Sequence, residues 1–358
     1  MRVPFSVLSG RRVLVTGHTG FKGGWLCHWL RRLGADVVGV SLPAPSDPSF
    51  FAATDLGNTI DSRMADIRDR AALAAALGGD DFEVIFHMAA QSLVRESYAT
   101  PVETFDTNVM GTAHVLECAR KMQSLRAVVV VTSDKCYDNK EWDWGYREND
   151  PMGGADPYSA SKGCTELLAA SYRSSFFNDP KGPALATVRA GNVFGGGDWA
   201  RDRLIPDIIR AVVGGHATEV RSPSSVRPWQ HVLEPLSGYL SLAACLVEQG
   251  HSYAEGWNFG PDTSGVADVR HLADLFQSNW GAGGPQFLFG AGTSALHEAK
   301  VLRLDSTKAA TRLQWRPRLS LEEAVGWTVD WYKAFFAGKD LIDLTDTQIS
   351  HYAAIQNA

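Results

Sequence analysis

The sequence Val15-Thr16-Gly17-His18-Thr19-Gly20-Phe21-Lys22-Gly23 joins a short apolar run, Val13 to Val15, to a helical pattern over 25–30 that stops at Gly34. Glycine at every third position permits a tight turn and lets a pyrophosphate approach the backbone. The helix that follows offers free N–H groups and the positive end of its dipole. The stretch therefore predicts a strand, a phosphate-binding turn and a helix that together bind a dinucleotide.

Similar apolar runs recur along the first half of the chain. Val37 to Val40, Val84 to Phe86 and Val128 to Val131 are separated from one another by helix-like segments. Continuous runs rich in β-branched residues are typical of parallel strands that are buried on both faces. The alternation predicts an α/β fold, a doubly wound parallel sheet of the Rossmann type.

The pattern becomes irregular after about Gly191, where glycines and prolines separate shorter elements. We expect a smaller C-terminal α/β domain that binds the substrate, with the ligand in the cleft between the two units. The predicted dinucleotide-binding domain covers 1–190, with 228–262 returning to it. The substrate-binding domain covers 191–227 and 263–340, and 341–358 is a C-terminal tail.

The composition is that of an ordinary folded protein, with 358 residues, 45% of them hydrophobic. Its 34 Lys and Arg against 40 Asp and Glu give a net charge of −6, which argues against binding to nucleic acid or anionic membranes. The sequence has neither a membrane-spanning apolar run nor, over Met1 to Arg12, a signal peptide. Five widely spaced cysteines fit neither a disulfide framework nor a zinc site. We therefore expect a cytoplasmic protein without a bound metal.

The end of the second predicted strand departs from the common dinucleotide pattern. Val40-Ser41-Leu42-Pro43 offers neither a carboxylate for the ribose nor an arginine for a 2′-phosphate, which favours NAD over NADP only slightly. Asp66-Ile67-Arg68 follows the third strand, where Asp66 would meet the adenine. The alternative is that Asp66 caps a helix that begins near Arg68.

Tyr158 and Lys162 have the spacing that puts two side chains on one face of a helix, and Pro157 suits its first turn. An ammonium beside a phenol stabilises the phenolate and would lower the pKa of Tyr158 from its usual value of about 10. Such a tyrosine can remove a hydroxyl proton while hydride leaves the same carbon. The alternative is a solvated helix face with no chemical role.

Ser133-Asp134-Lys135 closes the run that ends at Val131. The carboxyl ends of parallel strands face the ligand crevice, so these side chains are expected beside Tyr158. A hydroxyl, a carboxyl and an amine together exceed what hydride transfer alone requires. The alternative is that Asp134 and Lys135 form only a turn and a surface pair.

The chain resembles the nucleotide-sugar 4,6-dehydratases of the extended short-chain dehydrogenase/reductase family over nearly its whole length. The G-x-x-G-x-x-G spacing is typical of that superfamily. The other matching stretches are His87-Met88-Ala89-Ala90-Gln91-Ser92-Leu93-Val94-Arg95, Asn108-Val109-Met110-Gly111-Thr112, 132–139, 195–200, 227–235 and 313–317. Most members have Thr-Asp-Glu where this chain has Ser133-Asp134-Lys135, and lysine there is typical of the branch that acts on CDP-glucose.

The resemblance implies an internal redox cycle on CDP-glucose with NAD as cofactor. Tyr158 would take the proton of the glucose 4-hydroxyl as hydride leaves C4, with Ser133 bonded to the same oxygen. Asp134 would protonate the departing 6-hydroxyl as water is eliminated across C5 and C6, and hydride would return to C6. Lys135 would act as the C5 base or assist it, where related enzymes use a glutamate. The product would be CDP-4-keto-6-deoxyglucose.

The binding residues follow from the glycine-rich turn, the ends of the strands and the resemblance. For the cofactor we expect Gly17, Thr19, Gly20, Phe21, Lys22, Gly23, Asp66, Ile67, Ala89, Ala90, Gln91, Asn108, Tyr158 and Lys162. For the nucleotide sugar we expect Asn192, Arg203, Leu204, Ile205, Arg227 and His297, with Glu298 and Lys300 near them. A guanidinium such as that of Arg227 suits a pyrophosphate, although an arginine near a loop can also be merely solvated.

Other functions stay open at this point. A UDP-, dTDP- or GDP-sugar 4,6-dehydratase or a 4-epimerase would use the same scaffold, although an epimerase has little use for Asp134 and Lys135. A non-catalytic dinucleotide-binding regulator would not need Ser133, Tyr158 and Lys162 together. The resemblance also implies deoxysugar biosynthesis, as for lipopolysaccharide O-antigen. It further implies a homodimer or homotetramer formed through helices over about 101–122 and 157–177.

Overall fold

The computed structural model describes residues 3–220, 222–262, 265–290 and 302–357. Its centre is a seven-stranded sheet in the order β11-β6-β5-β4-β1-β2-β3, with every pairing parallel. The strands are β1 Arg12–Thr16, β2 Asp36–Ser41, β3 Asp61–Met64, β4 Val84–His87, β5 Ala127–Val131, β6 Ala184–Arg189 and β11 Gly256–Asn258. The predicted doubly wound parallel sheet is confirmed. Its order reverses between β1 and β4, where such sheets bind ligands.

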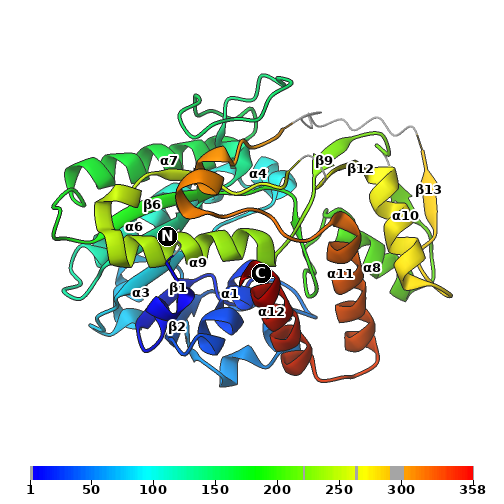
Figure 1. Ribbon diagram of the computed structural model, residues 1–358, viewed down its shortest axis with the longest axis horizontal. Helices are drawn as coiled ribbons and strands as arrows, with labels where there is room; N and C mark the ends of the chain where they lie inside the picture. The colour runs from blue at the N-terminus through cyan, green and yellow to red at the C-terminus, as the bar shows by residue number, and fades with distance from the viewer. Residues whose placement is uncertain (1–2, 221, 263–264, 291–301, 358) are drawn as a thin grey trace.

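Helices cover both faces of this sheet (Figure 1). They are α1 Phe21–Arg32, α3 Arg70–Leu77, α4 Val94–Ala99, α5 Pro101–Phe105, α6 Gly111–Ala119, α7 Pro157–Ser175, α9 Leu233–Gln249 and α12 Leu341–Asn357, with a short α2 Phe50–Ala53. Alternate residues of β1 point to opposite faces. Val13 and Val15 belong to a core with residues of α1, α9 and α12, whereas Leu14 belongs to a second core with residues of α3 and α6.

The rest of the chain forms a smaller unit at the right of Figure 1. Its elements are β7 Val193–Phe194, α8 Leu204–Gly214, β8 Thr218–Val220, β9 Val226–Pro228, β10 Gln230–His231, β12 Val266–Asp268, α10 Val269–Trp280, β13 Phe287–Phe289 and α11 Leu321–Phe336. The short strands pair as β10 with β7, β12 with β9 and β13 with β8. These small sheets and helices carry segments that complete a cavity over the main sheet.

Two later segments pack against the large sheet and its helices. Strand β11 pairs with β6, so the chain returns to the main sheet within the range 228–262. The predicted tail, 341–358, is helical from Leu341 to Asn357 and packs on α1, where Arg31 lies 3.0 Å from Asp346 and Trp29 meets Tyr352 edge to face. Among the described residues, no helix has both the length and the apolar character needed to cross a bilayer.

Candidate active site

A cavity of ≈ 1100 Å³ lies at the carboxyl ends of the central strands. Most of the residues predicted from the sequence line it. For the cofactor they are Gly17, Thr19, Gly20, Phe21, Lys22, Gly23, Asp66, Ile67, Ala89, Ala90 and Gln91; for catalysis Ser133, Asp134, Lys135, Tyr158 and Lys162; and for the substrate Asn192, Arg203, Leu204, Ile205 and Arg227. His297, with Glu298 and Lys300, lies outside the described residues.

The glycine-rich turn connects β1 to α1 as predicted. Gly17 has φ 81°, and a Cβ there would lie 2.7 Å from the backbone nitrogen of Ala89. A Cβ on Gly23 would lie 2.1 Å from the carbonyl oxygen of Gly17. Gly20 begins α1 without a side-chain cap, so the first N–H groups of this helix are available to an anion.

Asn108 is the one described cofactor candidate that lies behind the cavity wall rather than in it. Its side chain accepts a hydrogen bond from the backbone N–H of Gln91 at 2.9 Å and donates to Ser161 Oγ at 2.8 Å. The side chain is 1% exposed. Asn108 therefore joins the segment after β4 to α7 instead of facing a ligand.

Asp66 lines the cavity, but its carboxylate is bound to Arg68. Arg68 Nη2 lies 2.6 Å and Nε 2.9 Å from Asp66 Oδ2, and this guanidinium lowers the pKa of Asp66. Helix α3 begins later, at Arg70, and Asp69 is its cap. The alternative that Asp66 caps the helix is therefore wrong, because the chain makes a turn before the helix starts.

Asp134 begins a short 3-10 turn, Asp134–Cys136, and Ser133 caps this turn two residues after the end of β5. Ser133 Oγ donates to Asp134 Oδ1 at 2.9 Å and accepts from the backbone N–H of Lys135 at 3.2 Å. Both side chains are buried, whereas Lys135 is half-buried at the cavity wall. The turn thus presents a hydroxyl and a carboxyl to the cavity as one hydrogen-bonded unit.

Tyr158 lies in the first turn of α7, which Asp156 caps by accepting from the N–H of Ser159. Burial raises the pKa of Tyr158 to about 12, and its hydrogen bond with Ser133 offsets part of that rise. Lys162 Nζ donates to the carbonyl oxygen of Val131 at 3.3 Å, and burial lowers its pKa to about 8. The expected lowering of the Tyr158 pKa is therefore wrong for this structure, because desolvation of the phenol outweighs its neighbours.

Lys22, which was predicted as a cofactor-binding residue, brings a second, half-buried amine to the cavity, and the sequence did not indicate its hydrogen-bond partner. Its Nζ donates to the hydroxyl of Tyr239 on α9 at 3.0 Å. Burial lowers the pKa of Lys22 to about 7, and the nearby cations Arg203 and Lys162 lower it further. The sequence shows only a lysine within a turn of small and apolar residues. It cannot reveal the hydrogen bond to Tyr239, because Tyr239 is 217 residues away along the chain.

The substrate candidates lie on the side of the cavity that the smaller unit provides. Arg203 Nη1 lies 3.0 Å from Asp198 Oδ2, and its Nη2 donates to Ser92 Oγ at 3.2 Å. Asn192 has φ 49° and directly follows Gly191, where a Cβ would lie 1.8 Å from Asp134 Oδ2. The backbone at 191–192 therefore packs directly against the carboxyl of Asp134, at a distance that leaves no room for a side chain at position 191.

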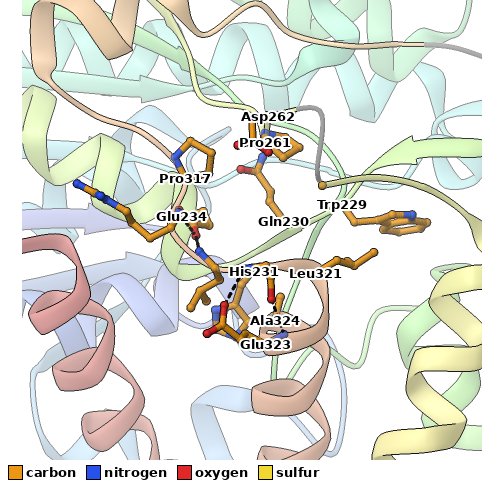
Figure 2. Close-up of a pocket in the computed structure, with 14 residues that line it drawn as sticks. Trp229, Gln230, His231, Glu234, Pro261, Asp262, Pro317, Leu321, Glu323 and Ala324 are labelled. Carbon is orange, nitrogen blue, oxygen red and sulfur yellow. Dashed lines mark hydrogen bonds between the residues drawn. The ribbon is translucent and has the colours of Figure 1, made fainter. Parts of the chain in front are cut away.

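A smaller cavity of ≈ 260 Å³ lies beside Trp229, Gln230 and His231 (Figure 2). Its buried carboxylate, Glu234, accepts from the backbone N–H groups of Arg318 and Leu319 at 2.8 and 2.7 Å and from the Tyr352 hydroxyl. These bonds join α9 to the segment before α11. Since the predicted catalytic side chains line the larger cavity, that cavity is the candidate active site.

The model of the NAD dependent epimerase/dehydratase family matches residues 13–253. The chain belongs to this family. It is 50% identical over 347 residues to a CDP-glucose 4,6-dehydratase of Salmonella typhimurium, covering 96% of each chain. It is 27% identical over 326 residues to a UDP-glucose 4-epimerase of Mycolicibacterium smegmatis, covering 90% of this chain and 98% of the other.

A solved member of the same fold is a UDP-glucose-4-epimerase from Stenotrophomonas maltophila with bound NAD and formylated UDP-arabinopyranose. It superposes with a TM-score of 0.78 at 24% identity, over 92% of this chain and 99% of the other. At that identity the similarity shows the shared fold of the epimerase/dehydratase family and no more.

The residues present here fit the dinucleotide that this family uses. The close approach of the backbone at Gly17 and Gly23 leaves the turn free of side chains, and the uncapped start of α1 suits a pyrophosphate. Among residues 3–220, 222–262, 265–290 and 302–357, no group of three or more His, Cys, Asp or Glu side chains is placed to hold a metal ion.

Proposed function

We propose that this member of the epimerase/dehydratase family converts CDP-D-glucose to CDP-4-keto-6-deoxy-D-glucose. The observation that carries the proposal is the buried unit of Ser133, Asp134 and Tyr158, which shares one cavity with the glycine-rich turn. The similarity to a CDP-glucose 4,6-dehydratase at 50% identity supports both the reaction and the nucleotide. A simple 4-epimerase would have little use for a carboxyl bonded to the serine.

NAD, bound at the glycine-rich turn, would supply the hydride acceptor for C4 and the hydride donor for C6. Tyr158 takes the proton of the 4-hydroxyl, and Ser133 holds the same oxygen. Because the pKa of Tyr158 is raised to about 12, the phenol rests protonated near neutral pH. Its proton must therefore leave as the substrate arrives, and the hydrogen bond with Ser133 and the nearby guanidinium of Arg203 favour that loss.

Elimination of water across C5 and C6 then needs an acid and a base. We assign the acid to Asp134, which is supported by its carboxyl lying at the cavity wall between Ser133 and Gly191. Lys135 supplies the amine nearest to it in the chain, and we assign to it the role of C5 base or of its assistant. If the amine has no such role, Lys135→Ala will exchange solvent deuterium into C5 at the normal rate.

The CDP group would lie toward the smaller unit. Arg227, on β9, and Asn192, after β6, line that part of the cavity and suit the pyrophosphate. Arg203, Leu204 and Ile205 begin α8 and form the adjoining wall. We also propose His297 as a substrate-binding residue, on the basis of the family resemblance alone.

The proposal includes a homodimer or homotetramer, formed through α5, the turn after it, and α7. Val102 is 75% exposed on α5, Met110 is 49% exposed and Leu167 is 62% exposed on α7, and α5 packs against α7. Exposed apolar side chains on helices that pack together are typical of an interface between subunits. We also place the enzyme in the cytoplasm, which its five free cysteines support. We propose that its product enters deoxysugar biosynthesis.

The direct test is a parallel assay of CDP-, UDP- and dTDP-glucose and GDP-mannose that scores a 4-keto-6-deoxy sugar. We expect CDP-glucose to be turned over best. Tyr158→Phe should lower kcat by about 100-fold to 10,000-fold, the usual range for a proton-transfer group. Tyr172→Phe, a matched change farther along α7, should leave kcat unchanged. Equal turnover of all four substrates would contradict the nucleotide assignment, and formation of a C4 epimer alone would contradict the reaction.

A further inference from the structure

A buried ion pair lies beneath the catalytic turn without reaching the cavity. Arg189, at the end of β6, binds Glu166 of α7 with two parallel contacts, Nη2 to Oε2 at 2.8 Å and Nε to Oε1 at 2.9 Å. The side chains are only 4% and 5% exposed. Two threonine hydroxyls also donate to this carboxylate, Thr132 Oγ1 to Oε1 at 2.5 Å and Thr187 Oγ1 to Oε2 at 2.7 Å.

The same pair also bonds to the chain on the other side of the catalytic turn. Arg189 Nη1 donates to the hydroxyl of Tyr137 at 2.5 Å and to the carbonyl oxygen of Glu148 at 3.0 Å. The Tyr137 hydroxyl in turn donates to Asn258 Oδ1 at 2.7 Å. Thr132 and Tyr137 directly flank residues 133–136, so one ion pair holds both ends of the segment that carries Ser133, Asp134 and Lys135.

The energetics favour a role in geometry over a role in stability. Removing two charges from water is costly, and the attraction between them often does not repay that cost. Both oxygens of this carboxylate and all three nitrogens of this guanidinium are bonded, and such a pair instead fixes directions, because a bidentate guanidinium tolerates little rotation. Glu166 also lies one helical turn after Lys162, and its negative charge favours the protonated form of Lys162.

We propose that Glu166 and Arg189 are positioning residues for the reaction, acting through Thr132 and Tyr137 to hold the turn 133–136 in its reactive geometry. The role rests on the proposed function, since the turn carries the residues assigned to it. Neither Glu166 nor Arg189 lines the cavity, so neither contacts the substrate.

The chain offers a matched pair of variants. Thr132→Val and Thr187→Val each remove one buried hydroxyl from the same carboxylate, but only Thr132 adjoins the catalytic turn. With the substrate that the wild type turns over best, we expect Thr132→Val to lower kcat at least tenfold, with KM within about twofold. Thr187→Val should keep kcat within about twofold, and Thr132→Ser, which retains the hydroxyl, should restore activity.

A second readout does not depend on any substrate. Hydrogen–deuterium exchange of the peptide that covers 133–137 should be faster in Thr132→Val and in Tyr137→Phe, and unchanged in Thr187→Val. Unchanged exchange in the first two variants, or an equal loss of kcat in Thr132→Val and Thr187→Val, would overturn the proposal. Failure of both Thr132→Val and Tyr137→Phe to fold would also overturn it in favour of a purely structural pair. An inactive wild type with the expected exchange pattern would instead count against the proposed function alone.

Discussion

At the scale of single residues, the site depends on one position without a side chain. A Cβ on Gly191 would lie 1.8 Å from Asp134 Oδ2, so alanine there must displace the carboxyl. We predict that Gly191→Ala lowers kcat by about 100-fold, the effect expected when a reacting group moves by about 1 Å. Gly326→Ala in α11, where the nearest atom is 3.3 Å away, should leave kcat unchanged. Steady-state kinetics of both variants check this, and an active Gly191→Ala enzyme would show that Asp134 need not stay in place.

The sequence predicted where the candidate catalytic residues lie better than it predicted their protonation state. Ser133, Asp134 and Tyr158 could be found because they follow strand ends or begin a helix at recognisable motifs. The raised pKa of Tyr158 depends on how completely the surrounding chain removes water, which no motif records. Lys22 shows the same limit, since its hydrogen-bond partner Tyr239 is 217 residues away.

At the scale of elements, four strands of the large sheet, β1, β2, β4 and β5, were predicted from their apolar runs, and the short strands of the smaller unit were not. A run such as Val128 to Val131 is apolar throughout because both faces of β5 are buried. The two-residue strands β7 and β10 carry no such periodicity and exist only because they pair with each other. Helix α12 was expected as a tail, since its contacts with α1 cannot be read from its own sequence.

The exposed apolar side chains of α5 and α7 lead to a prediction at this scale. Val102→Glu combined with Leu167→Glu should convert the proposed oligomer to monomers, because two carboxylates would have to be buried at the proposed interface. Val213→Glu on α8, which replaces a side chain that is 62% exposed, should leave the assembly intact. Light scattering on the three proteins decides between these outcomes. An unchanged particle mass for the double variant would remove these helices from the interface.

At the scale of the whole molecule, four histidines make the stability depend on pH. Burial lowers the pKa of His18 and His28 to about 4 and that of His87 and His231 to about 3. Below the unfolded value of about 6.5, the unfolded chain therefore binds more protons than the folded one. We predict that the free energy of unfolding falls from pH 6.5 to pH 4, by about 1.4 kcal/mol per pH unit for each such histidine.

Urea unfolding at pH 7, 6 and 5 measures this slope. His87→Gln should reduce this slope by about 1.4 kcal/mol per pH unit, which corresponds to one proton. Glutamine can still bond to Thr16 and Thr112 but does not titrate. The exposed His216 provides the control, and His216→Gln should leave the slope unchanged. A slope that is the same in all three proteins would contradict the buried, neutral state of His87.

We propose that one cavity moves a hydride within a single sugar, from C4 to C6. The most direct measurement follows deuterium from CDP-[4-²H]glucose by NMR. We expect a 4-keto-6-deoxy product with the deuterium on C6. Deuterium returned to C4 of an epimerised hexose, or released to solvent, would contradict it.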